Sequence, residues 1–273
     1  MSYPIPVSDI LGTLHDLGVR RGDSLFIHSS FRSLYRGAAV ETMPALSSEA
    51  YARLLIQELL NHVGPKGSLM MPTEFLADYH LSSFRKELID IRKVGTNRGF
   101  LTQMLLSWPG AVRSAHPVYN VVAVGETLAK SVASHHTLPY SMDVGSPWWD
   151  FKMAGGKIVY LGASLESNSF IHMPEYALKN DYPRPVFFNR PHGFDIIDQS
   201  GRPVSMEAWV HAIRWPGGTV TRFCNYLQLQ YGIFNHGMVA DTSVIVVSAA
   251  AQYDALMQEL DHGTSWYDAI GWA

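Results

Sequence analysis

Cysteine is nearly absent from this chain of 273 residues, because Cys224 is the only one. An internal disulfide is therefore excluded, which fits a reducing compartment, and we expect a cytoplasmic protein. Cys224 lies inside a predicted helix over residues 219–230, between the apolar side chains of Phe223 and Leu227. A thiol in that setting acts as a small buried hydrophobe, so we expect no nucleophilic cysteine.

Charge is also scarce: Asp, Glu, Lys and Arg together make up 16% of the residues, and the net charge is −3. A nucleic-acid-binding protein would carry a clustered basic face, and none is present. No apolar run reaches the 18 residues that a membrane span needs, and the first residues do not form a signal peptide. With 47% hydrophobic residues, the chain is predicted to be compact and well buried, and a small anionic ligand stays possible because it needs only a few local Arg or Lys residues.

The two common nucleotide-binding fingerprints, G-x-x-x-x-G-K and G-x-G-x-x-G, are missing after every predicted strand. A different polar segment follows the first strand, which is predicted over residues 25–27. It begins with His28, Ser29 and Ser30 and continues through two arginines. Backbone N–H groups, hydroxyls and guanidinium groups there suit a phosphate, although an ordinary polar loop has the same composition.

Strand and helix patterns alternate up to residue 162, which predicts an α/β fold. We expect a mixed, largely parallel central sheet with helices on both faces, an α/β/α sandwich. The pattern changes after residue 185, where short apolar runs separated by turns predict a small antiparallel excursion. Since no linker, repeat or low-complexity tract interrupts the chain, residues 1–273 are expected to form a single domain.

His172 and Glu175 are the most informative pair in the chain. They follow an apolar run over residues 157–162 that reads as a buried strand ending in a glycine. Residues three apart share one face of a helical turn, so the carboxylate can orient the imidazole. An imidazole held in this way can remove a proton near neutral pH. The alternative is a surface pair at the start of a capped helix, because H-x-x-E is a common spacing.

Two further polar segments adjoin predicted strands. One contains Arg113, Ser114 and His116, and the other contains Thr73, Glu74 and Asp78. In open α/β sheets, ligands bind in the crevice outside the strand ends. Several such segments meeting at one edge therefore favour a small-molecule site there.

Four segments, taken in order, resemble those of the aminoglycoside 3-N-acetyltransferases, also called the antibiotic N-acetyltransferase family. They cover residues 22–34, 67–73, 109–117 and 146–175. The T-x-x-H-x-x-E motif of that family falls on Ser169, His172 and Glu175, with serine replacing the usual threonine. The resemblance implies acetyl transfer from acetyl-CoA to an amine of an aminoglycoside or amino-sugar-like acceptor, without a metal and through direct attack.

The resemblance also implies roles for individual residues, with His172 as general base and Glu175 as its partner. Coenzyme A would be bound by the segment after the first strand and by one later segment, namely His28, Ser29, Ser30, Phe31, Arg32, Ser33, Leu34, Arg36, Arg113 and Ser114. The acceptor would contact Thr73, Glu74, Asp78, His116 and Ser169. No nucleic acid or membrane partner is expected, and a homodimer stays open.

The main alternative is a zinc-dependent hydrolase. His172, Glu175 and His192 would provide two imidazoles and one carboxylate, with an open position for water. This hypothesis names no general-base carboxylate and leaves the segment after His28 unexplained. A second alternative is a non-catalytic relative that binds coenzyme A or a partner, which the intact His172 and Glu175 disfavour.

Overall fold

The computed structural model describes residues 4–36, 46–74 and 88–272. The main sheet has seven strands in the order β4 (Val112–Arg113), β5 (Val121–Val124), β2 (Ser68–Pro72), β1 (Ser24–Ser29), β6 (Lys157–Leu161), β10 (Thr242–Ser248) and β9 (Phe234–Val239). The α-helices in the described part are α1 (Val7–Asp16), α2 (Phe31–Arg36), α3 (Ser48–Val63), α4 (Phe100–Leu106), α5 (Glu126–Ser134), α6 (Pro147–Met153), α7 (Met173–Leu178), α8 (Thr219–Tyr231) and α9 (Ala249–Asp261).

The predicted mixed sheet with helices on both faces is confirmed, but its parallel part is smaller than expected. Only β2, β1 and β6 run parallel, and the four outer pairings are antiparallel. The reason is visible between β9 and β10, which a two-residue turn at Ala240 and Asp241 connects. Ala240 has a φ of 51°, which suits the tight turns that join antiparallel strands. Ala-Asp is not a typical sequence for such a turn.

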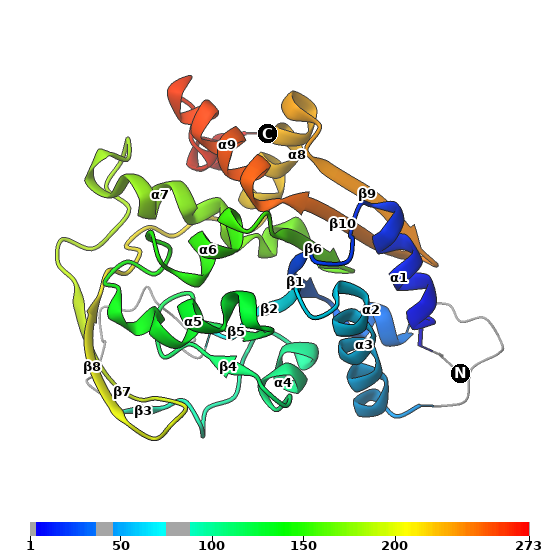
Figure 1. The fold of residues 1–273 in the computed structure, drawn as a ribbon. Helices are drawn as coiled ribbons and strands as arrows, with labels where there is room; N and C mark the ends of the chain where they lie inside the picture. The colour runs from blue at the N-terminus through cyan, green and yellow to red at the C-terminus, as the bar shows by residue number, and fades with distance from the viewer. Residues whose placement is uncertain (1–3, 37–45, 75–87, 273) are drawn as a thin grey trace.

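Helices cover both faces of the sheet because the central strands are apolar on both sides. Leu25 and Ile27 of β1 point to the face covered by α1, α3 and α4, and Phe26 points to the opposite face. There it packs with residues of α5, α6, α8 and α9 (Figure 1). Two fully buried apolar clusters result, one on each side of the sheet.

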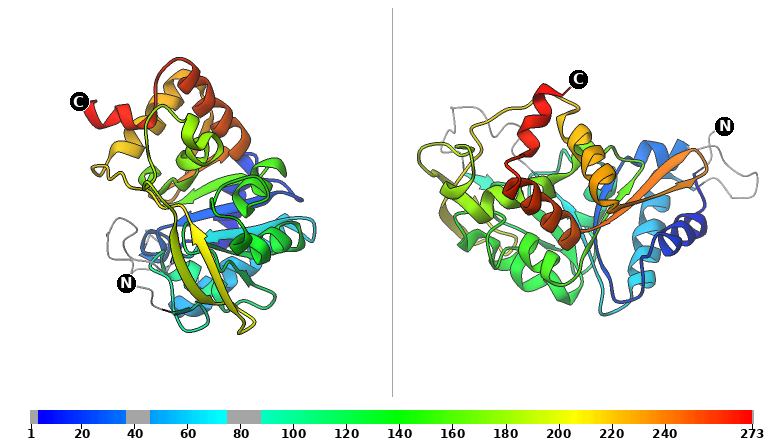
Figure 2. Two further views of the ribbon diagram at one scale, coloured as in Figure 1. Left: turned by 90° about the vertical axis from the view of Figure 1, so that its left-hand side faces the viewer. Right: turned by 90° about the horizontal axis from the view of Figure 1, so that it is seen from above.

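A second sheet of three strands accounts for the antiparallel excursion predicted after residue 185. It contains β3 (Ile89–Asp90), β7 (His192–Ile197) and β8 (Pro203–Ala208), and β7 pairs with β8 in a hairpin. The Asp198 carboxylate stabilises the turn of the hairpin, since it accepts the N–H groups of Ser200 at 2.8 Å and Arg202 at 2.9 Å. The hairpin lies on the opposite side of the molecule from α1 (Figure 2).

After β8 the chain runs back beside the segment that precedes β7. An isolated bridge between Phe187 and His211 marks this return. It places His211, far along the sequence, next to the residues that follow β6.

Within the described ranges, no helix combines the length and the apolar character that crossing a lipid bilayer would require.

Candidate functional site

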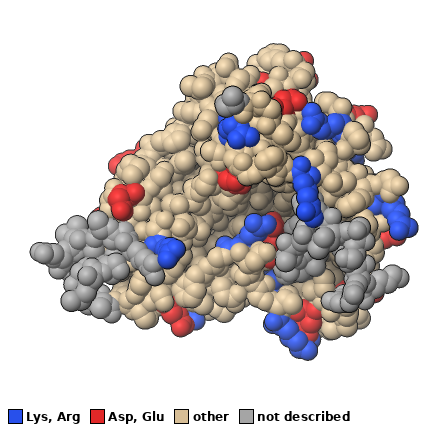
Figure 3. All heavy atoms as spheres, turned by 180° about the vertical axis from the view of Figure 1, so that it is seen from behind, with Lys and Arg blue, Asp and Glu red and all other residues tan. Residues whose placement is uncertain are grey.

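The candidate site lies where the three parallel strands end. β1 and β6 are neighbours, but the chain leads from β1 to β2 on one side and from β6 toward β10 on the other. Such a switch point opens a crevice at the carboxyl edge of the sheet, where α/β proteins bind ligands. A space-filling view from behind shows a hollow in the molecular surface that contains both basic and acidic side chains (Figure 3).

His172 and Glu175 reach this edge through a short, tightly turned segment after β6. Two 3₁₀ turns, η2 (Leu165–Ser167) and η3 (Ser169–His172), lead directly into α7. The Asn168 side chain caps the second turn by accepting the N–H of Phe170 at 3.2 Å. His172 Nδ1 then lies 3.2 Å from Glu175 Oε2, as the i, i+3 spacing predicts.

Glu175 is the centre of a buried hydrogen-bond network that sequence reasoning did not find. Its Oε2 atom also lies 2.6 Å from His211 Nε2, while the indole N–H of Trp266 donates to Oε1 at 2.6 Å. The Tyr119 hydroxyl lies 3.2 Å from His211 Nδ1. Glu175 is fully buried and both imidazoles are 3% exposed, so water does not compete for these bonds.

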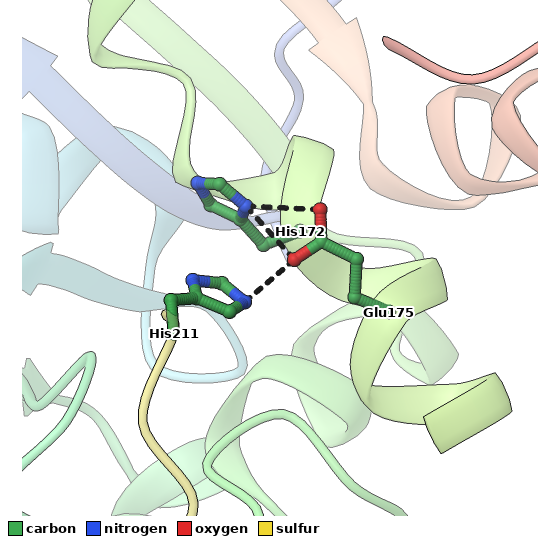
Figure 4. Close-up of side chains that lie close together, drawn as sticks. All are labelled: His172, Glu175 and His211. Carbon is green, nitrogen blue, oxygen red and sulfur yellow. Dashed lines mark hydrogen bonds and ion pairs between the residues drawn. The ribbon is translucent and has the colours of Figure 1, made fainter. Parts of the chain in front are cut away.

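The network determines which ring nitrogens carry protons. Burial alone would raise the pKa of the Glu175 carboxyl, but the neighbouring His172 and His211 imidazoles lower this pKa to about 2. An ionised carboxylate only accepts hydrogen bonds, so His172 donates from Nδ1, while His211 Nε2 makes a close contact with Oε2 at 2.6 Å. Neutral His172 therefore has its lone pair on Nε2, which points away from Glu175 (Figure 4). The geometry gives a base with one defined tautomer.

Tyr119 completes the network from the opposite side. Its hydroxyl is within hydrogen-bond distance of His211 Nδ1, on the far side of that ring from Glu175. The Tyr119 ring centroid is 5.2 Å from that of His172. Tyr119 has a φ of 47°, a left-handed conformation that costs about 1–2 kcal/mol outside glycine. The indole N–H of Trp148 donates to the Tyr119 carbonyl at 2.9 Å and holds this conformation.

The segment predicted to bind coenzyme A is a short helix rather than an open loop. Ser30 N–H donates to the Leu161 carbonyl at 2.9 Å, and the Ser30 and Ser33 hydroxyls are 2.9 Å apart. Ser29 and Phe31 are half-buried and Arg32 is exposed, whereas Leu34 is fully buried in an apolar cluster. Leu34 therefore has no surface to offer a ligand, and nothing is described for the Arg36 side chain.

His28 follows the same strand but is buried against its neighbours. Its ring stacks on Tyr160 of β6, with 5.1 Å between ring centroids. Burial, and secondarily the positive charge of Arg98, lower the His28 pKa to about 3. His28 is thus a neutral part of the wall beneath the crevice.

The segment after α4 is held by hydrogen bonds to other parts of the protein. Arg113 donates to the carbonyls of Ile91, Val94 and Gly95 at 2.5–2.9 Å, which fixes the chain around β3.

The other two predicted residues of that segment are fully buried. Ser114 Oγ lies 2.7 Å from His135 Nδ1. Both ring nitrogens of His116 lie near carbonyls, those of Val118 and Leu138, and burial lowers the His116 pKa to about 4. These contacts stabilise the fold behind the site.

The predicted acceptor residues differ in their surroundings. Thr73 is fully buried and its hydroxyl bonds to the Asn120 side chain, while Glu74, 1% exposed, pairs with Arg98. Ser169 is half-buried on η3, three residues before His172. Asp78 lies outside the described residues.

The hypothesis of a zinc site built from His172, Glu175 and His192 is not supported. His192 begins β7, where its ring packs against Phe188 with 5.1 Å between centroids. Among the described residues, His211 takes the place expected for it, and the potential ligand atoms of His172, Glu175 and His211 lie within 4.8 Å of one another. The second imidazole therefore comes from the chain after β8.

Sequence reasoning missed His211, Tyr119, Trp266 and Trp215. None of them stands in a recognisable motif or at a helical spacing from His172. The one usable signal was indirect, because four of the seven tryptophans follow residue 208 and cluster outside the βα pattern.

Known proteins similar to this chain were found by sequence. A family model described as aminoglycoside 3-N-acetyltransferase matches residues 26–261. An aminoglycoside N(3)-acetyltransferase III from Salmonella sp is 33% identical over 199 residues, covering 67% of this chain and 64% of that protein. One from Serratia marcescens is 31% identical, covering 68% of this chain and 69% of that protein. The match thus spans slightly less than two thirds of the first relative's length.

Solved structures share the fold. Aminoglycoside acetyltransferase AAC(3)-Xa superimposes with a TM-score of 0.73 at 21% identity, covering 92% of this chain and 91% of its own. A mutant of AAC(3)-IVa in complex with a gentamicin has a TM-score of 0.69 at 22% identity (99% and 98% covered). AAC-IIIb, binary with CoASH, has a TM-score of 0.71 at 19% identity (93% and 96% covered). From the family match over residues 26–261, this chain belongs to the aminoglycoside 3-N-acetyltransferase family.

Proposed function

We propose that this chain transfers the acetyl group of acetyl-CoA to a primary amine of an aminoglycoside or amino-sugar-like acceptor. The observation that carries the proposal is the His172 imidazole, whose Nδ1 is bonded to a buried, ionised carboxylate and whose Nε2 therefore carries the lone pair of a base. Relatives named aminoglycoside N(3)-acetyltransferases, and fold neighbours solved with CoASH or a gentamicin, support the choice of substrates.

The reaction requires one proton transfer and one exchange of bonds. The acceptor nitrogen, in its uncharged amine form, attacks the thioester carbonyl as His172 Nε2 removes its proton. A carbon–nitrogen bond forms, the carbon–sulfur bond breaks, and the thiolate leaves as coenzyme A after taking the proton from the imidazolium. General-base catalysis of this kind contributes about 10²–10⁴-fold to the rate.

Glu175 and the groups that contact it stabilise His172 in its imidazolium form. When His172 becomes an imidazolium, the carboxylate 3.2 Å away offsets the new positive charge in a buried site of low dielectric constant. His211 and Trp266 hold the carboxylate ionised and in position, so we propose a positioning role for both.

Transfer is proposed to be direct and to need no metal ion. The Cys224 thiol is fully buried, and burial raises its pKa to about 12, so a thiolate is not available to carry the acetyl group. His172 and Trp266 donate hydrogen bonds to the Glu175 carboxylate, and His211 Nε2 lies 2.6 Å from its Oε2 atom, so a metal ion would have to displace these contacts.

We propose that coenzyme A enters over the end of β1. Ser29, Ser30 and Arg32 lie there with half-buried or exposed side chains, and the chain turns into α2. Ser169 is proposed to contact the acceptor.

The test is thiol release from acetyl-CoA with gentamicin as acceptor, comparing the unmodified protein with His172→Ala. We expect the variant to lose at least about 10²-fold in kcat/KM and to bind acetyl-CoA normally in calorimetry. His262→Ala, a change of an exposed histidine after α9, is the matched control. Unchanged turnover in His172→Ala removes this residue from the mechanism, and no thiol release from the unmodified protein contradicts the proposed reaction.

A further inference from the structure

A half-buried tryptophan lies directly against the proposed base. Trp215 is in the connection between β8 and α8, and its ring centroid is 5.0 Å from that of His172, with 49° between the ring planes. The rings of Tyr119, His211 and Trp266 also lie within 5.2 Å of the His172 ring, and all three belong to the network around Glu175. Trp215 is therefore in a position to meet whatever approaches the base.

The orientation of Trp215 is set by residues that also orient the base. Its ring packs edge-on against Trp266, at 4.9 Å and 89°, and lies 6.3 Å from the ring of Tyr267. The N–H of Trp266 is itself bonded to Glu175. The position of the Trp215 indole is therefore coupled to the position of the His172 imidazole.

Burial distinguishes Trp215 from two other tryptophans near the site. Trp148 is 0% exposed and Trp266 is 2% exposed, whereas Trp215 is half-buried. Part of the Trp215 side chain therefore borders solvent close to the base. Arg214 and Pro216, its neighbours in the chain, are less buried than the core around them, so this connection lies at the surface of the molecule.

We infer that Trp215 is the platform on which the acceptor's amine-bearing ring rests during transfer, an inference that depends on the proposed function. A cation over an indole face is attracted by the ring quadrupole, and tryptophan is the strongest of the aromatic residues in this respect. A saturated ring carrying several ammonium groups presents both apolar C–H edges and such cations. Trp215 would hold that ring while its reactive amine nitrogen faces His172 Nε2.

The position of Trp215 favours the acceptor over the coenzyme. In acetyl-CoA, the one large aromatic group is the adenine, which the pantetheine arm separates from the thioester. The thioester carbonyl and the acceptor nitrogen must both be at His172 for transfer. An indole 5.0 Å from that imidazole is thus next to the acceptor ring rather than to the adenine.

The experiment measures binding and turnover separately in Trp215→Leu and Trp215→Phe. Trp149→Leu is the matched control, because Trp149 is also half-buried but lies on α6, where Lys152 Nζ sits 3.7 Å from its ring centroid. We expect Trp215→Leu to weaken gentamicin binding about 2- to 30-fold in calorimetry, the range of a cation–π contact. Trp215→Phe should recover part of the loss, and acetyl-CoA affinity should not change in any variant.

In steady-state kinetics, the same loss should appear in the KM for gentamicin and not in the KM for acetyl-CoA. Equal gentamicin affinity in Trp215→Leu and Trp149→Leu overturns the inference, as does a loss of affinity for acetyl-CoA alone. These outcomes are distinct from failure of the proposed function. If the proposed function fails, the unmodified protein binds gentamicin and acetyl-CoA but releases no thiol.

Discussion

Replacing Glu175 by Gln changes the charge at the centre of the site and almost nothing of its shape. The carboxylate accepts N–H groups from His172 and Trp266, and its Oε2 atom lies 2.6 Å from His211 Nε2. An amide has one oxygen acceptor, and its NH₂ group is a donor, so it cannot accept from the nitrogens on both sides. The least costly rearrangement is a change of tautomer in His172. Its Nδ1 atom then accepts a hydrogen bond from the new amide group, and its Nε2 atom carries the proton. That tautomer has no lone pair for the acceptor amine.

The expected effect on turnover follows from the loss of a correctly oriented base. We expect kcat/KM for thiol release in Glu175→Gln to fall by at least about 10²-fold. Acetyl-CoA binding should stay within about twofold, because no coenzyme-binding group changes.

The expected effect on stability follows from the depressed pKa of Glu175. Its ordinary value of 4.5 falls to about 2 in the folded protein. Each pKa unit between the unfolded and the folded protein corresponds to about 1.4 kcal/mol. The ionised carboxyl therefore contributes about 3 kcal/mol to the free energy of unfolding. That contribution is fully present above pH 4.5 and is lost as the pH falls toward 2. The stability difference between the two proteins should therefore shrink below pH 4.5 in urea titrations.

The matched control is Glu259→Gln. Glu259 is also buried, at 3% exposure, and accepts the hydroxyls of Tyr226 and Tyr231 at 2.8 and 2.6 Å. Its amide variant should lower the unfolding free energy and leave kcat/KM unchanged. If Glu175→Gln turns over like the unmodified protein, the assignment of the base and its tautomer is refuted.

Three further outcomes are expected. Cys224→Ser should retain turnover within about twofold, and iodoacetamide should label the native thiol far more slowly than the unfolded one, because burial raises its pKa to about 12. Dialysis against EDTA should not change kcat, since N–H donors occupy both Glu175 oxygens, and restoration of a lost activity by added zinc would contradict this. His211→Phe should lower kcat more than it raises the KM for gentamicin. The loss of kcat should grow as the pH falls, because Glu175 then lacks one of the two imidazoles that lower its pKa. Equal effects on both parameters at every pH would assign His211 a purely structural role.

Local features of the fold were predictable because contiguous residues encode them. The helix predicted over residues 219–230 agrees with α8 to within one residue, since glycines flank a stretch with apolar residues at helical spacing. The strand over residues 157–161 was recognisable as an apolar run ended by Gly162. The strand β9 was missed, because its residues Phe234–Val239 include exposed polar positions and carry no strong alternation.

The sequence by itself determined the pair His172–Glu175, because residues three apart on a helical turn face each other whatever the rest of the chain does. Only the tertiary structure decided what surrounds that pair. His211 and Trp266 reach Glu175 across 36 and 91 residues of chain, and Tyr119 reaches His211 across 92. Such contacts depend on where the chain returns after the small sheet. No local spacing encodes that return, so the acid and base were readable from the sequence and their supporting network was not.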